Sequence, residues 1–392
     1  MRTLLAILLL AALPFAGLTQ SDSTKTPLKD KLRLSGYIKD LRSASFPRDI
    51  NLLTTDNLYH NRLNFRAFVS KKITLGLEAR NRIFYGETVR LTPGYADFID
   101  ADNGLVDLSW NWIDESTIVA NSTLDRAWLQ FANDKWDVRL GRQRINWGIN
   151  TIWNPNDLFN TYNFIDFDYE ERPGSDALRV QHFTGPMSSI ELAIKPARNE
   201  DEWVGAMMYK FNKWNYDWQV LGGWYNQDYA LGVGWAGNIK LAGFKGEATY
   251  FHPQNNLTDT SGVLSASMAV DYIFKSQLYL SGGFLYNSAG VINPNDPAAV
   301  GLFAAPISAK NLLPMRVSGL ITAGYPISPL LNVNATVLFA PGVNVAFAMP
   351  SVTYSIAKNW DLSFFGQTLL ANVGDGLGAQ STSVFVRLKW SF

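Results

Sequence analysis

The sequence predicts an all-β protein, an antiparallel transmembrane β-barrel of about 18 strands behind an N-terminal signal peptide. Three observations carry this prediction. The chain starts with an export signal but has no later apolar run long enough for a membrane helix. Segment after segment alternates apolar and polar residues with period two. The connections between these segments alternate between short turns and longer loops, as they do in outer-membrane barrels.

The first twenty residues have the organisation of a secretory signal. Arg2 precedes an apolar core at 4–13, and small residues near 17–20 offer a cleavage point. The core is shorter than the roughly 20 apolar residues of a membrane-spanning helix, which makes a true N-terminal anchor the less favoured alternative. We therefore expect a signal peptide at 1–20 and a barrel at 21–392.

Composition narrows the function classes. The chain has 34 Lys+Arg and 34 Asp+Glu, so net charge gives no argument for a nucleic-acid partner. Cysteine is absent, which excludes disulfides, thiolate metal sites and a lipid-anchor cysteine. Charged residues are 17% of the chain, below the roughly 25% of soluble domains, and aromatic residues are 13%. The remaining classes are an outer-membrane barrel and a secreted or periplasmic soluble β-protein.

The strands are expected where the alternation is regular over about ten residues, the length of a tilted membrane-crossing strand. The predicted segments are 31–42, 59–70, 73–85, 123–131, 136–145, 176–183, 188–196, 202–211, 214–224, 228–239, 242–252, 262–274, 276–286, 312–325, 330–340, 344–356, 359–370 and 381–392. Sixteen strands is the alternative count, because 202–211 and 228–239 alternate least regularly.

The short and the long connections are expected to lie at opposite ends of the barrel. Tight polar turns follow the even-numbered segments, for example at Lys71-Lys72 and Lys358-Asn359. The long connections all follow odd-numbered segments: 43–58, 86–122, 146–175, 253–261, 287–311 and 371–380. In an outer-membrane barrel this pattern places the turns and both termini in the periplasm. Four tryptophans fall at that end, where an aromatic girdle is expected: Trp136, Trp214, Trp360 and Trp390.

The last strand, Val384–Phe392, alternates cleanly and ends in Phe392. It resembles the C-terminal signal that the bacterial barrel-assembly machinery recognises, which implies that machinery as a partner and the outer membrane of a Gram-negative-type bacterium as the location. A second stretch, Leu140–Gly148 (LGRQRINWG), followed by Trp153–Phe159 and Glu171–Gly174, resembles poorly characterised porin-like barrels and barrels of the alginate-export type. That resemblance implies a large-lumen transport barrel whose loop folds into the pore.

Basic residues dominate the inward positions of the N-terminal strands. Because a charge on the lipid face costs about 2–4 kcal/mol near the midplane, such residues are expected to face the lumen. The predicted pore-lining residues are Arg62, Arg66, Glu78, Arg80, Arg82, Arg126, Arg139, Arg179, Arg387 and Lys389. Two interpretations stay open: the arginines pair with lumen carboxylates and fill the barrel, or they select anions, since guanidinium groups bind carboxylate and phosphate in a two-pronged fashion.

Loop 146–175 is expected to narrow the lumen. The residues predicted near this constriction are Arg142, Arg144, Trp147, Trp153 and Asn154. The alternative is an external loop packed on its neighbours. The closing strand must also pair with the first strand, which predicts that Arg33 and Lys39 lie near Arg387 and Lys389.

Other functional classes find little support. Neither an enzyme nor a cofactor is expected, because the three histidines, His60, His182 and His252, lie in no recognisable catalytic motif. The acidic residues Asp166 to Glu171 lack a full Ca²⁺-ligand pattern, so no metal site is expected. The leading function is a porin-like channel for passive diffusion of small polar solutes, anionic or saccharide ones among them, in contact with outer-membrane lipid. The alternative is a non-conducting barrel in envelope assembly, adhesion or export.

Overall fold

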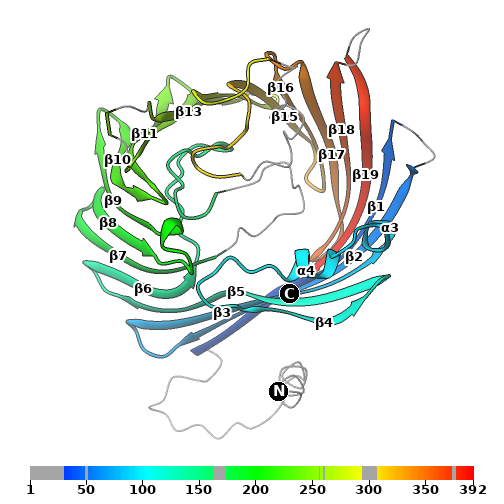
Figure 1. The fold of residues 1–392 in the computed structure, drawn as a ribbon, viewed down its shortest axis with the longest axis horizontal. Helices are drawn as coiled ribbons and strands as arrows, with labels where there is room; N and C mark the ends of the chain where they lie inside the picture. Colours follow the sequence, from blue (N-terminus) through cyan, green and yellow to red (C-terminus); the bar gives the residue numbers. More distant parts are fainter. Residues whose placement is uncertain are drawn as a thin grey trace, which may run out of the picture.

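In the computed structural model the chain forms one closed antiparallel β-barrel (Figure 1). The structure describes residues 31–48, 52–161, 174–255, 257–258, 261–293, 307–372 and 377–392. The predicted signal peptide and the Asp166–Glu171 cluster lie outside these ranges.

Nineteen strands occur in the described ranges, and eighteen of them form the ring. Their bounds are β1 Leu32–Pro47, β2 Thr54–Phe68, β3 Ile73–Gly86, β4 Ser109–Glu115, β5 Ile118–Ala132, β6 Trp136–Gln143, β7 Ser175–Gly185, β8 Ser188–Lys195, β9 Val204–Lys213, β10 Tyr216–Tyr225, β11 Asp228–Ile239, β12 Ala242–Pro253, β13 Val263–Ile273, β14 Tyr279–Asn287, β15 Val317–Ser328, β16 Leu331–Ala340, β17 Val345–Ala357, β18 Trp360–Asn372 and β19 Leu377–Ser391. Each of the eighteen predicted segments overlaps one ring strand, which confirms the count of 18 over 16, although β1, β2 and β5 extend further into the predicted loops.

The barrel closes where β1 pairs with β19. Gly36 and Phe392 exchange backbone hydrogen bonds at the end of this seam, at 2.9 and 3.0 Å. A side chain at Gly36 could not be accommodated, because its Cβ would lie 2.1 Å from the carbonyl oxygen of Arg62. The register places Lys39 directly opposite Lys389, as predicted, whereas Arg33 lies beyond the end of the β1–β19 pairing.

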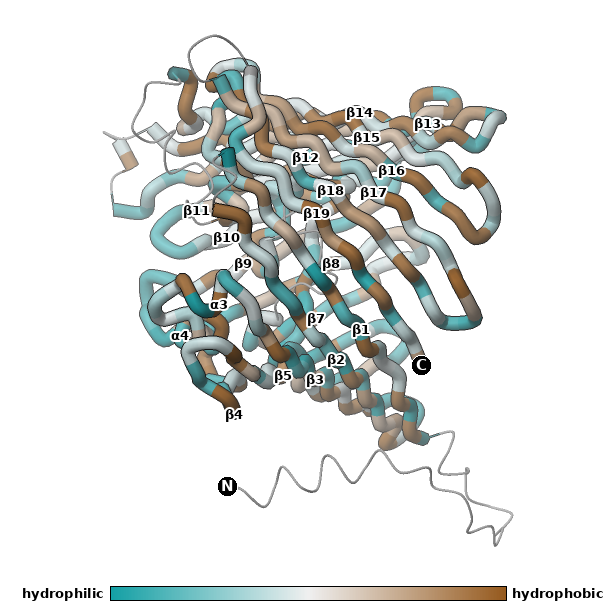
Figure 2. Tube along the Cα trace, turned by 90° about the vertical axis from the view of Figure 1, so that its right-hand side faces the viewer, coloured by the Kyte–Doolittle hydropathy of each residue, from teal (hydrophilic) through white to brown (hydrophobic). Residues whose placement is uncertain are grey.

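The connections at one end of the barrel, beside the chain's C-terminus, are short, and the long connections gather at the other end, where the two-residue connection between β10 and β11 also lies (Figure 2). One of these turns joins β9 to β10 through Trp214 and Asn215, both with positive φ, as a type I′ hairpin requires. At the same end Trp360 stacks on Trp390 across β18 and β19 with ring centroids 6.1 Å apart. The predicted polarity of turns and loops is therefore confirmed.

The distribution of side chains is the reverse of that in a soluble protein. Large apolar residues face outward, and Leu231 is 65% exposed while Val220 is 50% exposed. Polar residues on the inner face are buried, among them Gln219 and Glu247 at 0%. An apolar outer band around a polar interior is the pattern of a transmembrane barrel. In the described ranges, no helix is long and apolar enough to cross a membrane.

Two connections fold into the barrel instead of standing outside it (Figure 1). Residues 145–159, after β6, and residues 309–315, before β15, contribute buried apolar side chains to clusters that also contain wall residues of β7 to β17. Lys310 fixes the second segment through an ion pair with Asp228 at 2.6 Å. The entry of the first segment was predicted, but that of the second was not.

The predicted loop 86–122 contains more structure than its sequence indicated. It holds two short helices, α3 Glu87–Leu91 and α4 Tyr95–Asp100, and the extra strand β4, which pairs with the loop-side half of β5. A short 3₁₀ helix, η2 Glu200–Glu202, lies between β8 and β9. Elements of five to seven residues are too short for a periodic signal to identify.

Candidate functional site: an arginine-rich cavity

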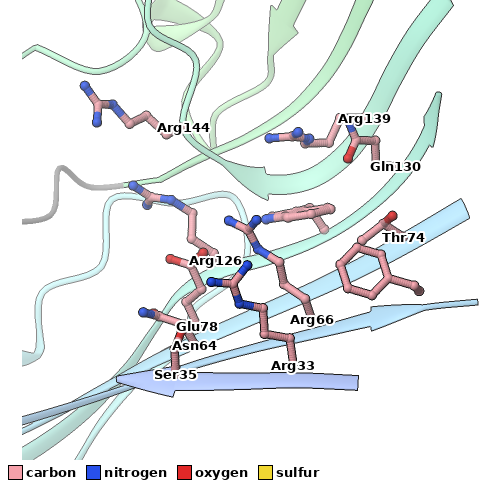
Figure 3. Close-up of a pocket in the computed structure, with 12 residues that line it drawn as sticks. Arg33, Ser35, Asn64, Arg66, Thr74, Glu78, Arg126, Gln130, Arg139 and Arg144 are labelled. Atoms are coloured by element: carbon pink, nitrogen blue, oxygen red, sulfur yellow. The ribbon is translucent and has the colours of Figure 1, made fainter. Parts of the chain in front are cut away.

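A cavity of about 460 Å³ opens on the inner face of β1 to β6. Five arginines contribute to its wall and extend into a common space (Figure 3). They are Arg33, Arg66, Arg126, Arg139 and Arg144. One carboxylate, Glu78, also lines it. The cavity belongs to the half of the lumen nearer the turns, since Phe68, Thr74 and Gln130 lie close to strand ends there.

Four of these arginines lack a carboxylate partner among the described residues: Arg33, Arg66, Arg139 and Arg144. Arg33 and Arg66 lie directly opposite each other across β1 and β2. Like charges in that position destabilise a sheet. An anion bound between these two guanidinium groups would reduce their repulsion and would itself be stabilised by their charge.

An aromatic shelf supports one of the guanidinium groups. Arg139 lies over the ring of Trp128, 4.4 Å from its centroid. Trp128 in turn lies flat on the barrel wall, because Gly76 opposite it has no side chain and a Cβ there would be 2.4 Å from the indole. The Trp128 ring is 8% exposed, so it lies packed between the wall and the guanidinium group that it supports.

A buried ion-pair cluster lies beside the cavity. Arg62 is 0% exposed and donates to Asp125 and to Glu78, both at 2.6 Å, and to Asn64 at 2.9 Å. Arg80 also pairs with Asp125, at 3.0 Å. This part of the basic wall is neutralised internally, as the pairing interpretation of the sequence expected.

Asp125 was not predicted from the sequence, because it faces the lumen only through a β-bulge. Pairing of β3 with β5 passes from Glu78 opposite Arg126 directly to Ala79 opposite Leu124, which leaves Asp125 as the extra residue. Strict alternation from Arg126 would place it on the lipid side. A bulge breaks that alternation, and here it brings a carboxylate to Arg62.

The other predicted lining residues are inward and have partners. Arg179 pairs with Glu191 at 2.8 Å and with Asp137 at 3.7 Å. Arg82 donates to Asn121 at 3.1 Å. At the seam, Arg387 lies over the ring of Phe365 at 4.8 Å and Lys389 over that of Tyr37 at 4.6 Å.

The inward segment after β6 is attached to the wall by a buried carboxylate. Glu247 of β12 accepts hydrogen bonds from the backbone N–H groups of Ile149, of Asn150 at 2.7 Å and of Asn156 at 3.0 Å. Asn156 also accepts from the hydroxyl of Thr249 at 2.6 Å.

Trp147 and Trp153 are 1% and 3% exposed, so they pack against the wall. The indole N–H of Trp147 donates to Glu191 at 2.6 Å. Asn154 is buried as well, at 4%. These three predicted constriction residues therefore attach the segment, while Arg144 reaches the cavity.

Arg142 lies on the outer face of the barrel, which corrects the expectation that it is near a constriction. The alternation that turns Arg139 inward turns Arg142 outward. It pairs there with Asp176 at 2.8 Å and with Asp102 at 2.6 Å. Burial alone would raise the pKa of Asp102, but the hydrogen bonds from Arg142 and from the backbone N–H groups of Leu108 and Gly104 outweigh it and lower that pKa.

The described residues contain no cluster of three or more potential metal ligands. His60 lies 3.4 Å from the hydroxyl of Tyr37 and is buried among basic side chains. His182 and His252 contact backbone carbonyls near strand ends.

Neither a family model nor a curated protein matches this chain. Solved structures do match its fold along almost the whole length. OpdQ of Pseudomonas aeruginosa has a TM-score of 0.57 and 8% identity, over 92% of this chain and 98% of that one. OccAB4 of Acinetobacter baumannii has a TM-score of 0.57 and 12% identity, over 95% and 100%. The outer membrane protein OprD of Pseudomonas aeruginosa has a TM-score of 0.56 and 8% identity, over 92% and 93%. The chain therefore has the fold of these barrels.

Proposed function

We propose that this protein is a porin-like channel of the outer membrane, through which small polar solutes diffuse passively and anionic ones pass preferentially. The observation that carries the proposal is the cavity in the lumen wall, where four arginines lack a carboxylate partner among the described residues. Guanidinium groups in a pore favour anions without any energy input. The fold shared with OprD supports the location.

The inward segments support a selective passage. Residues 145–159 and 309–315 pack on the β7–β17 side of the interior, whereas the arginine cavity lies on the β1–β6 side. A solute crossing the lumen would pass between these two inward segments on one side and the arginine-rich wall on the other. Arg66 and Arg139 would then attract it, while the segment fixed by Glu247 sets the width.

Among the solutes expected from the sequence, carboxylated ones, acidic saccharides included, suit the charge of the cavity. The forked guanidinium groups suit a carboxylate. The resemblance of Leu140–Gly148 to alginate-export-type barrels points the same way and stays a prediction.

The test is ion selectivity of a double variant, Arg66→Ala with Arg139→Ala, in planar bilayers. Each charge at about 4 Å in water contributes about 1 kcal/mol, or roughly fivefold in occupancy. We expect the permeability ratio of chloride to potassium to fall at least threefold. Lys240→Ala with Lys275→Ala, which removes two exposed charges from turns, is the matched control. An unchanged ratio in the double variant would refute the role of the cavity.

The alternative is a non-conducting barrel that acts in envelope assembly, adhesion or export. The two inward segments and the paired Arg62 cluster are the observations that favour it, since both fill the interior. Absence of single-channel steps from correctly folded protein would favour this alternative. The barrel-assembly machinery remains the proposed partner of the Val384–Phe392 strand in either case.

A further inference from the structure

A second cavity, of about 470 Å³, lies on the outside of the barrel and is almost wholly apolar. Its floor is formed by Leu140 of β6, Leu178 of β7 and Ile194 of β8, and Trp203 closes one side. Leu140 is 59% exposed and belongs to the lipid-facing row of its strand. We call this cavity the outer groove.

The outer groove has a fixed roof. Leu105 and Val106, from the connection between α4 and β4, lie over it. The Val106 N–H donates to Asp176 at 3.1 Å, and its carbonyl accepts from Arg142 at 2.6 Å. Since Asp102 in the same connection also pairs with Arg142, the roof is held from both of its sides. A hollow with a pinned roof differs from the plain lipid-facing surface of a barrel.

The position of the groove indicates its occupant. It lies within a few residues of the loop-side ends of β6, β7 and β8, and therefore at the depth of the outer leaflet. A cation stands beside the roof: Arg198 is exposed, and its Nε donates to the carbonyl of Leu105 at 3.4 Å. An apolar hollow next to an exposed guanidinium matches an acyl chain joined to a phosphate.

We propose that the outer groove is a specific lipid site that holds one acyl chain of lipopolysaccharide, with a lipid phosphate at Arg198. A bound chain would fill space that the 101–108 connection and the barrel wall leave between them. The site depends on the outer-membrane location but not on what the lumen passes. Its failure and the failure of the channel proposal are therefore separate results.

The experiment is native mass spectrometry of the full barrel, delipidated in detergent and then mixed with purified lipid A. Ala127→Trp fills the groove from its floor, because Ala127 lines it on β5. Ala266→Trp is the matched control, an alanine on the outer face of β13 far from the groove. Arg198→Ala tests the phosphate contact.

We expect wild type and Ala266→Trp to retain one lipid A at collision energies that strip detergent. The lipid-bound fraction of Ala127→Trp should fall by at least nine-tenths, and that of Arg198→Ala should fall by a smaller amount. Equal retention by Ala127→Trp and Ala266→Trp would overturn the proposal. So would equal retention of a neutral diacyl lipid, or a wild-type oligomer that Ala127→Trp alone dissociates, because a second copy of the chain would then occupy the groove.

Discussion

Replacing Glu247 by alanine should release the inward segment and open the lumen. Its carboxylate is 0% exposed and accepts three backbone hydrogen bonds from that segment. A hydrogen bond to a charged group contributes about 1.5–3 kcal/mol, so three amount to about 5 kcal/mol or more before water replaces any of them. The contacts of Trp147 with Glu191 and of Asn156 with Thr249 remain, so we expect a segment that detaches intermittently.

Two assays report this release. Single-channel recording should show larger and noisier conductance for Glu247→Ala than for Glu115→Ala, an exposed acid whose loss changes the net charge equally. The chain has no cysteine, so Leu158→Cys provides a unique thiol at a position where the leucine is 3% exposed. A maleimide should modify it at least tenfold faster in the Glu247→Ala background. Equal conductance and equal labelling would refute the view that this carboxylate holds the segment in place.

Three further predictions concern stability and assembly. Asp125→Ala should destabilise the barrel by about 3 kcal/mol, the low end for a broken buried ion pair because Arg62 keeps another carboxylate; the temperature at which the folded band disappears on a semi-native gel should fall, and an unchanged temperature would contradict the prediction. Because the pKa of Asp102 is lowered, its stabilising pair with Arg142 is fully present above the usual pKa of about 3.9 and is lost as the pH falls through the lowered value. Proteolysis of the 101–108 connection should therefore stay slow at pH 5 and accelerate only below about pH 4. Acceleration at pH 5 would count against this prediction. Deletion of Phe392, whose backbone closes the seam, should reduce the amount of barrel in outer-membrane fractions at least fivefold, and normal amounts would show that the terminal residue is dispensable.

Alternation with period two was sufficient to locate every strand of the ring, because each strand separates lipid from the interior of the barrel. A shift by one residue would turn polar side chains toward lipid and apolar side chains inward, at a large cost in free energy. The same rule failed where the backbone departs from regular pairing. Asp125 reaches the lumen through a bulge, which no periodic pattern reveals. Arg142 was assigned to the interior although alternation from Arg139 places it outside.

The interior was harder to predict than the wall. The segment 309–315 packs inside the barrel through contacts with strands far away in sequence, and such contacts leave no local signal. Nothing in the sequence distinguishes Glu247 from other acids, because its role depends on backbone N–H groups that come from a distant part of the chain. The arginine wall was predicted by residue type, but which arginines lack a carboxylate partner among the described residues depends on distances that only the structure supplies.

The central claim is that the lumen conducts and prefers anions. The most direct measurement is the reversal potential of the purified wild-type barrel in a planar bilayer across a tenfold gradient of potassium chloride. We predict discrete single-channel steps and a reversal potential whose sign corresponds to chloride passing more readily than potassium. A folded barrel that gives no steps, or a reversal potential of the opposite sign, would contradict the claim.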